Sequence, residues 1–290
     1  MSVNTGGQSL NLLSNAYRYP SPAIWANCPV DEILADPGRG LYHFDDFTDL
    51  PLAPTLTTQI AFGKYKAYAA SGCTIGRVST INSVEIMGGA LEIGTDTDND
   101  EAAIGDAYAS YRLSGDKDTS GKLWFECCYA QNSIATNLAS TFLGLGEVDA
   151  FTFGANVPMN SGDAIDNSGS MIGFQIKEDG LGTIDTVVSD RATSFTDIGD
   201  DEGGTLAANT FRKLGFVYDP FAADPAKMIT FYANNLVLAT EISKTTLQAY
   251  TNLDANCLGL MWAVAADSAG TSFKGWLKWW RIAQLFPKDY

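Results

Sequence analysis

The sequence has few basic residues and no long apolar run, and each shortage excludes a class of function. Lysine and arginine number 18 against 34 aspartate and glutamate residues, a formal net charge of −16 at pH 7. This balance disfavours non-specific nucleic-acid binding and attraction to anionic membranes. A membrane-spanning helix needs about 18 or more consecutive apolar residues, and no stretch of the sequence approaches that length. The start, MSVNTGGQSLNLL, lacks the basic and apolar regions of a secretory signal, so we expect a protein made and kept soluble in a cytoplasm.

Motifs for metals, cofactors and covalent catalysis are also missing. The single histidine, His43, stands near Asp45 and Asp46, but a zinc centre usually needs more nitrogen or sulfur ligands. There is no GxSxG elbow and no phosphate-binding glycine loop. The acidic run at 96–101 has a glutamate where a calcium loop needs glycine, which indicates a solvated loop. We therefore predict no cofactor, no metal site and no catalytic residue.

The five cysteines are odd in number and fit no zinc spacing. We interpret all of them as buried or semi-buried thiols of a reducing compartment. Two adjacent cysteines in one strand should point to opposite faces. The five are Cys28, Cys73, Cys127, Cys128 and Cys257.

Short runs rich in aromatic and aliphatic residues recur from about residue 55 to residue 286, most of them bounded by Gly, Asn, Asp or Pro. With 46% hydrophobic residues, the chain can bury a real core. The pattern predicts an antiparallel sheet rich in hairpins. We expect Ser83–Ile93 to form two strands joined by Gly88 and Gly89, and a short helix near residues 244–250. The other clear runs are 121–130, 140–146, 171–177, 183–189, 211–218, 228–233, 236–240, 258–265 and 276–286.

Residues 1–40 differ from the rest because prolines are dense there, and proline breaks both helix and sheet. We predict an extended N-terminal arm over 1–40, with one helical turn near 31–35, and a β-sandwich over 41–290. The arm carries apolar side chains that need burial, either against the sandwich or against a neighbouring subunit. They are the predicted partner-binding residues Tyr17, Tyr19, Ile24 and Trp25.

The last strand-like run, WLKWWRIAQLF, is apolar on both faces. Strict alternation places Trp276, Trp280 and Ile282 on one face and Trp279 on the other, with Leu277, Ala283 and Leu285. A strand with two apolar faces is typically covered by a layer on each side. We favour core and interface roles for its tryptophans, and keep Trp276 and Trp279 as glycan-binding residues in the alternative.

Charge is also uneven along the chain. Residues 274–288 carry four basic residues and no acid, whereas residues 92–118 carry eight acids and two bases. Such a molecule can pair head to tail with copies of itself. A solvated surface is the simpler interpretation, and we favour it.

The order of these runs resembles the concanavalin A-like lectin/glucanase and laminin-G-like jelly rolls. The resemblance lies in GGALEIGT, KLWFECCYA, STFLGLGE, MIGFQIKEDG, FRKLGFVYDP, ITFYANNLVLAT and LKWWRIAQL, over about residues 41–286. It implies an all-β antiparallel sandwich. The HFDDF run that follows the proline-rich arm is similar to concanavalin-like structural proteins of tailed-bacteriophage virions. That second resemblance implies a capsid decoration or cement role.

One run, EVDAFT at Glu147–Thr152, resembles the Glu-x-Asp-x-x-Glu pattern of laminarinase-like glycoside hydrolases. Glu147 and Asp149 match the pattern, but Thr152 stands where the second glutamate should be. A retaining glycosidase needs two carboxyl groups about 5 Å apart, one of which donates a proton. We therefore expect no enzymatic activity.

These observations favour a non-enzymatic virion protein that stabilises the head lattice. Its expected partners are the major capsid protein and copies of itself, with no nucleic acid and no membrane, and its expected location is the capsid surface after synthesis in the host cytoplasm. Deleting residues 1–40 is then expected to leave the sandwich folded and to abolish assembly. The alternatives are a carbohydrate-binding module of a phage tail or fibre, and a glycoside hydrolase-like protein.

Overall fold

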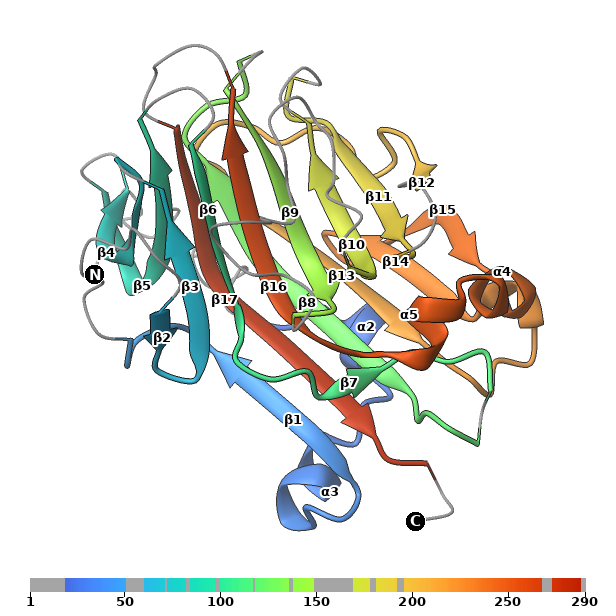
Figure 1. Cartoon of the computed structure of the whole chain (residues 1–290). Coiled ribbons are helices and arrows are strands. Elements are labelled where there is room, and N and C mark those ends of the chain that lie inside the picture. Colours follow the sequence, from blue (N-terminus) through green and yellow to red (C-terminus); the bar gives the residue numbers. More distant parts are fainter. Residues whose placement is uncertain are drawn as a thin grey trace, which may run out of the picture.

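The fold is a sandwich of two antiparallel sheets around one hydrophobic core (Figure 1). This computed structural model describes residues 19–50, 60–70, 72–81, 84–96, 100–116, 118–135, 138–148, 169–177, 181–191, 196–267 and 273–287. Side chains from both sheets fill the space between them, for example Phe125 and Phe216 from one and Phe174 from the other. The predicted all-β jelly-roll sandwich is confirmed. Within the described residues, no helix has the length and apolar character needed to cross a membrane.

The first sheet, sheet A, is formed by hairpins and by pairings between strands distant in sequence. In order across the sheet, its strands are β15 (Leu236–Ile242), β14 (Ile229–Ala233), β13 (Arg212–Tyr218), β8 (Leu123–Gln131), β17 (Phe273–Leu285), β5 (Val84–Thr95) and β4 (Thr74–Ile81). A further strand, β1 (Gly40–Asp45), pairs with the second half of β17, while β5 pairs with its first half. Both strands therefore border β17 on the side opposite β8.

The second sheet, sheet B, faces sheet A across the core. Its strands in order are β12 (Thr196–Gly199), β11 (Ile184–Ser189), β10 (Met171–Ile176), β9 (Ala139–Gly146), β16 (Cys257–Ala266), β6 (Glu101–Asp106), β3 (Tyr65–Ala69) and β2 (Ile60–Phe62), and β7 (Tyr111–Arg112) pairs with β16. The predicted runs 171–177 and 183–189 form β10 and β11, which pair antiparallel with each other.

Helices are short. They are α2 (Pro22–Trp25), α3 (Val30–Ala35), the 3-10 helix η1 (Pro225–Lys227), α4 (Lys244–Ala249) and α5 (Thr251–Ala255). The helix expected near 244–250 is confirmed as α4, where the Ser243 hydroxyl accepts the N–H of Thr246 and caps the first turn. In the described part of the N-terminal arm, the helical turn predicted near 31–35 is confirmed as α3, whereas α2 is a second helix that was not predicted.

Two local predictions were wrong. The glycines at 88 and 89 do not join two strands but lie inside β5, where both have positive φ (83° and 71°) and the β4–β5 register shifts nearby. They form a bulge, which glycine permits because it has no Cβ. Cys257, expected to be buried or semi-buried, is exposed. Cys127 does lie in the core between the sheets, as its position in β8 requires.

A bulge also interrupts β17 and changes which of its side chains face outward. Leu277 pairs with Tyr129 of β8, but the next pair joins Trp279 to Cys128. Between these two pairs β17 therefore contains one residue more than β8, which is a β-bulge. Leu277 and Trp280 therefore both face the core between the sheets. Trp276 and Ala283 lie instead in clusters on the face of sheet A that points away from sheet B, which we call the outer face. The expected grouping of Trp276 with Trp280 and Ile282 was wrong for this reason.

Candidate functional site

The outer face of sheet A is hollowed where β1 runs beside β17. One cavity of about 230 Å³ is lined by Pro20, Tyr42, Phe44, Trp279 and Arg281. A second, of about 330 Å³, shares the lining residues Phe44 and Trp279 with the first, so the two cavities are neighbours. We call the combined hollow the aromatic groove; the second cavity adds Tyr19, Asp46, Gly88, Gly89 and Lys278 to its lining.

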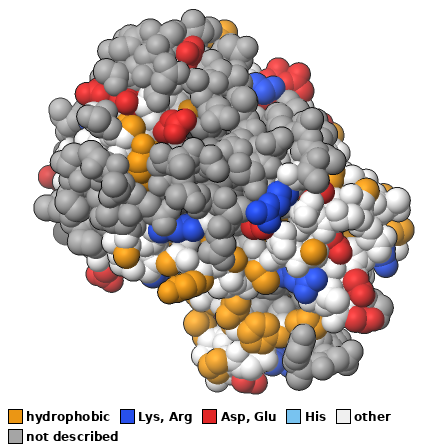
Figure 2. All heavy atoms as spheres, in the orientation of Figure 1, with side chains coloured by type: hydrophobic (Ala, Val, Ile, Leu, Met, Phe, Trp, Pro, Cys, Tyr) orange, Lys and Arg blue, Asp and Glu red, His pale blue; other side chains and the backbone are white. Residues whose placement is uncertain are grey.

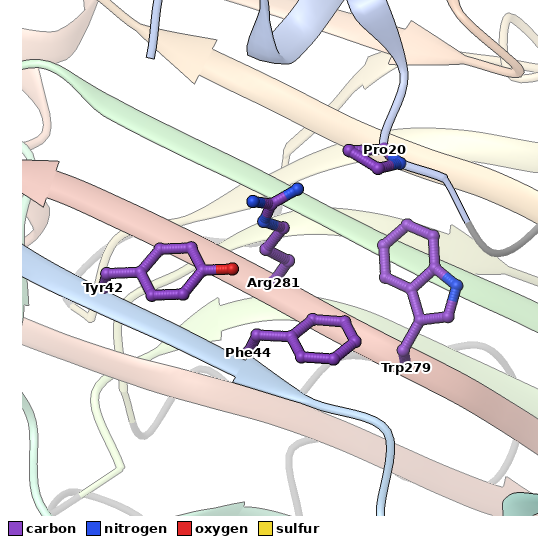
Figure 3. A pocket seen from close by; sticks show the side chains of 5 residues that line it. All are labelled: Pro20, Tyr42, Phe44, Trp279 and Arg281. Carbon is purple, nitrogen blue, oxygen red and sulfur yellow. The ribbon is translucent and has the colours of Figure 1, made fainter. Parts of the chain in front are cut away.

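Strand alternation explains how these side chains come together. Tyr42 and Phe44 are two residues apart in β1 and therefore point to the same face. Phe44 lies opposite Arg281 in the antiparallel register. The bulge in β17 places Trp279 and Arg281 on that same outer face. Figure 3 shows the result: two side chains from β1 and two from β17, with Pro20 approaching from the segment that leads to α2.

Aromatic rings of the groove differ in how much surface they offer. Tyr19 is 69% exposed and Phe44 45% exposed, so both present ring surface to solvent. Trp279 lines the groove but is only 3% exposed. Phe44 is thus the exposed ring on the rigid sheet against which a flat ligand can stack.

The guanidinium of Arg281 lies between two aromatic rings. Its central carbon is 4.4 Å from the ring centre of Trp25 and 5.2 Å from that of Tyr42. Stacking of this kind is favourable for arginine, whose planar group is weakly hydrated. Figure 3 shows Arg281 beside Tyr42 at the wall of the groove.

A buried carboxylate beneath α2 holds the N-terminal segment on the sheet. Both oxygens of Glu126 in β8 accept the backbone N–H of Ser21, at 3.0 and 3.2 Å, and Oε2 also accepts the indole N–H of Trp25 at 2.8 Å. Burial raises the pKa of Glu126, and these hydrogen bonds oppose the shift. Ile24 and Trp25 pack there against Trp124 and Ala283.

The predicted partner-binding residues have different positions. Ile24 and Trp25 are buried against the chain's own sheet A, which is one of the two destinations expected for them, and they are not exposed for a partner. Tyr19 is exposed at the groove. Tyr17 lies outside the described residues.

The two tryptophans of the glycan-binding alternative also separate. Trp276 is buried, and its indole N–H donates to Glu92 at 2.7 Å, so it offers no stacking face. Trp279 does line the groove. Sequence reasoning missed Tyr42, Phe44 and Arg281. The i, i+2 spacing of the first two in LYHF was the available signal, whereas the exposure of Arg281 to the groove depends on the bulge.

The terminal strand does not present a basic strip. Lys274 pairs with Glu92 at 3.2 Å, and Lys278 is buried with its ammonium 5.4 Å from the ring centre of Phe211. Pairing of that strand with acidic loops of another copy therefore has little support.

The glycosidase-like run is engaged by the chain itself where the structure describes it. Glu147 directly follows β9, and its Oε1 lies 3.1 Å from a guanidinium nitrogen of Arg191. Its Oε2 accepts the backbone N–H of Ser170 at 3.2 Å. Asp149 and Thr152 lie outside the described residues.

Two other candidate clusters have structural explanations. Asp185, Asp200 and Asp201 bring carboxylate oxygens within 4.8 Å of one another, but the ammonium of Lys177 lies 2.7 Å from Asp185 and 3.6 Å from Asp200. A lysine thus supplies the positive charge that a metal ion would bring.

His43 belongs to a network of hydrogen bonds that joins the sheets. Its Nε2 lies 3.1 Å from the hydroxyl of Tyr65, which donates to Asp45 at 2.6 Å and accepts from the indole of Trp280 at 3.0 Å. Burial and the nearby Lys64 lower the pKa of His43 to about 4. These contacts connect β1, β3 and β17, which is a structural role.

Comparison with known proteins gives the class of fold. No protein family matches the sequence, and no curated protein matches it. The chain has a concanavalin A-like, lectin/glucanase jelly-roll fold. It is similar to an endo-1,3-β-glucanase from Streptomyces sioyaensis (TM-score 0.51, 12% identity, 84% of this chain and 96% of that one).

Two further solved structures extend this comparison. A protein of unknown function from Shewanella oneidensis MR-1 covers 100% of this chain and 98% of its own length, with TM-score 0.50 and 11% identity. A carbohydrate esterase of the Shiga toxin-encoding bacteriophage phi24B covers 76% of this chain and 89% of its own, with TM-score 0.42 and 12% identity. At such identities the similarity establishes the fold alone.

Proposed function

We propose that the protein is a non-enzymatic binding protein that recognises a glycan in the aromatic groove. The observation that carries this proposal is the groove itself, in which an exposed phenylalanine lies beside a cationic side chain on a rigid sheet. Ligand sites are typically concave and largely apolar, with a few polar groups that fix orientation. Sugar rings have an apolar face that stacks on aromatic side chains and hydroxyl groups that bond to polar ones.

The carboxylates of the described residues support binding rather than hydrolysis. The described lining of the groove contains one acidic residue, Asp46, whereas most glycosidases use a pair of carboxyl groups. Glu147 follows a strand of the other sheet, and Arg191 and Ser170 engage its oxygens. The described lining of the groove therefore does not bring together a proton donor and a nucleophile that face one glycosidic bond.

Phe44→Ala tests the proposal. We expect this variant to lose glycan affinity by about tenfold or more, as interface hot spots do when truncated. The measurement is a glycan array followed by titration of the best ligand. The matched control is Phe221→Ala, since Phe221 is also an exposed phenylalanine but precedes η1. Equal losses in both variants, or none in Phe44→Ala, would contradict the proposal.

A second candidate function is decoration of a phage head, with the major capsid protein and copies of this chain as partners. One observation favours it: large apolar side chains are exposed on the N-terminal segment and β1, namely Tyr19, Leu34 and Phe44. Figure 2 shows hydrophobic side chains gathered over the part of the molecule where α3 and β1 lie. Apolar patches of this kind mark protein interfaces. The protein would then be located on the capsid surface after synthesis in the host cytoplasm.

A further inference from the structure

We propose that the aromatic groove selects a glycan that carries a carboxylate, and that Arg281 binds this carboxylate. The inference rests on the proposed function, because it names the ligand class of the same groove. Arg281 is a cation that has no ion-pair partner among the described residues.

Arg281 differs from the basic side chains that pair with a carboxylate. Arg39, Arg191 and Lys274, for example, form ion pairs with Glu32, Glu147 and Glu92. No ion pair joins Arg281 to a carboxylate of the described residues. Its Nε is buried and has no hydrogen-bond partner among those residues. Arg281 also lines the groove, so a ligand that supplies an acceptor to its guanidinium there gains a charge-assisted hydrogen bond.

The N-terminal segment explains why Arg281 is unpaired. Arg281 lies directly opposite Glu126 in the register of β17 and β8, where side chains of opposite charge usually attract each other. Trp25 contacts both of them: its indole N–H donates to Glu126, and its ring face stacks on the guanidinium. The backbone N–H of Ser21 donates to the same carboxylate. The N–H groups of Ser21 and Trp25 thus bond to Glu126. The N–H groups of the Arg281 guanidinium are left for a ligand in the groove.

The chemistry of the lining indicates the ligand. A guanidinium has a planar fork that matches the two oxygens of a carboxylate, and the Arg281 guanidinium packs against the rings of Trp25 and Tyr42. Phe44, opposite Arg281 in the register, offers its ring to an apolar face. A uronic or sialic acid residue combines a carboxylate with such a face. The net charge of −16 disfavours a dense polyanion, so we expect isolated acidic sugars within an otherwise neutral chain.

The test compares each acidic sugar with its own methyl ester, which has the same ring but no charge. The full chain is titrated calorimetrically with methyl glycosides of glucuronic acid, galacturonic acid and N-acetylneuraminic acid and with their esters. We expect at least one acid to bind about tenfold or more tightly than its ester, as charge-assisted hydrogen bonds allow, with a preference that weakens as salt rises.

Arg281→Gln is expected to reduce binding of the acid to the level of the ester and to leave binding of the ester unchanged. Arg281→Lys keeps the charge without the fork and is expected to fall between wild type and Arg281→Gln, which also separates recognition from misfolding. Lys227→Gln is the control, because it removes one positive charge from η1, next to β14 and away from β17. It should change neither affinity.

Each contrary outcome has its own meaning. Equal affinity for acid and ester in the wild type would overturn the role of Arg281 while leaving glycan binding in the groove intact. No affinity for any acid, ester or array glycan would overturn the proposed function as well. Arginine-dependent binding of a glutamate-rich peptide as tight as that of the sugars would assign the site to a protein carboxylate and overturn the glycan class.

Discussion

Asp106, at the end of β6, is a carboxyl group whose burial should make stability depend on pH. Its Oδ2 accepts the N–H of Leu260 at 2.8 Å, and burial raises its pKa from 3.8 to about 7. Between those values the folded state holds a proton that the unfolded state has released, so stability falls as pH rises from about 4 to about 7 and stays reduced above.

Asp106→Asn should remove this penalty, because the amide oxygen still accepts the bond from Leu260 and carries no charge. We expect the variant to be more stable than the wild type by up to about 4 kcal/mol at pH 8, with no difference near pH 4. Urea unfolding at several pH values measures this. Glu85→Gln, at an exposed position of β5, should show no such trend. An Asp106→Asn variant that is no more stable at pH 8 would show that the ionised carboxyl is well tolerated.

The variant must be compared with the wild type at each pH because His43 acts in the opposite direction. Its pKa is lowered to about 4 in the folded state, so stability is lost as pH falls from about 6.5 to about 4. In that interval the effects of the two groups oppose each other in the wild-type profile. The difference between wild type and Asp106→Asn isolates the carboxyl.

At the scale of elements, α2 is held on sheet A by one carboxylate. Glu126→Ala leaves the N–H groups of Ser21 and Trp25 without an acceptor, at a cost of about 1–3 kcal/mol for each buried orphan. We expect faster hydrogen–deuterium exchange in residues 19–36, with unchanged exchange in sheet B. Glu92→Gln is the control, because Glu92 also accepts an indole N–H on the same face but lies in β5. Unchanged exchange over α2 in Glu126→Ala would refute this account of docking.

Elements were more predictable than the orientation of their side chains. Runs such as FRKLGFVY and MITFYANN carry alternation and turn residues within a few positions, and they form β13, β14 and the turn at Asn234, where φ is positive. The bulges in β5 and β17 are set by pairing with distant strands. One extra residue reverses the face of everything beyond it, so Trp276 and Trp279 both face outward.

The candidate site depends even more on distant contacts. Tyr19 and Trp279 were candidates because exposed or interfacial aromatic residues are often functional, and both line the groove. Arg281 drew no attention because an arginine in a terminal strand usually has a solvated or ion-paired side chain. Whether Arg281 forms an ion pair depends on the contact between Trp25 and Glu126. These two residues are 101 positions apart in sequence, and no local pattern indicates such a contact.

At the scale of the whole molecule, the N-terminal segment is part of the folded body. Removing residues 1–40 would take Ile24, Trp25 and Ile33 from the outer face of sheet A and uncover Trp124 and Glu126. Each large apolar side chain that loses its burial costs about 1.5–3 kcal/mol. The deletion expected from the sequence to affect assembly alone would therefore destabilise the sandwich too, and a point substitution on its surface is the sharper test.

Leu34→Ser provides that test of the decoration role. Leu34 lies on α3 and is 62% exposed, so the substitution should leave the fold unchanged while removing apolar area from the exposed patch. If the protein decorates a phage head, we expect the variant to occupy fewer sites per particle, as measured by quantitative mass spectrometry against the major coat protein. Leu236→Ser is the matched control, since Leu236 is 70% exposed on β15 at the far edge of the sheet. Decoration would be supported if the wild type occurred in fixed proportion to the coat protein and only Leu34→Ser reduced that proportion. A few copies per particle would favour a tail location and the glycan-binding role. Absence of the protein from particles would rule decoration out.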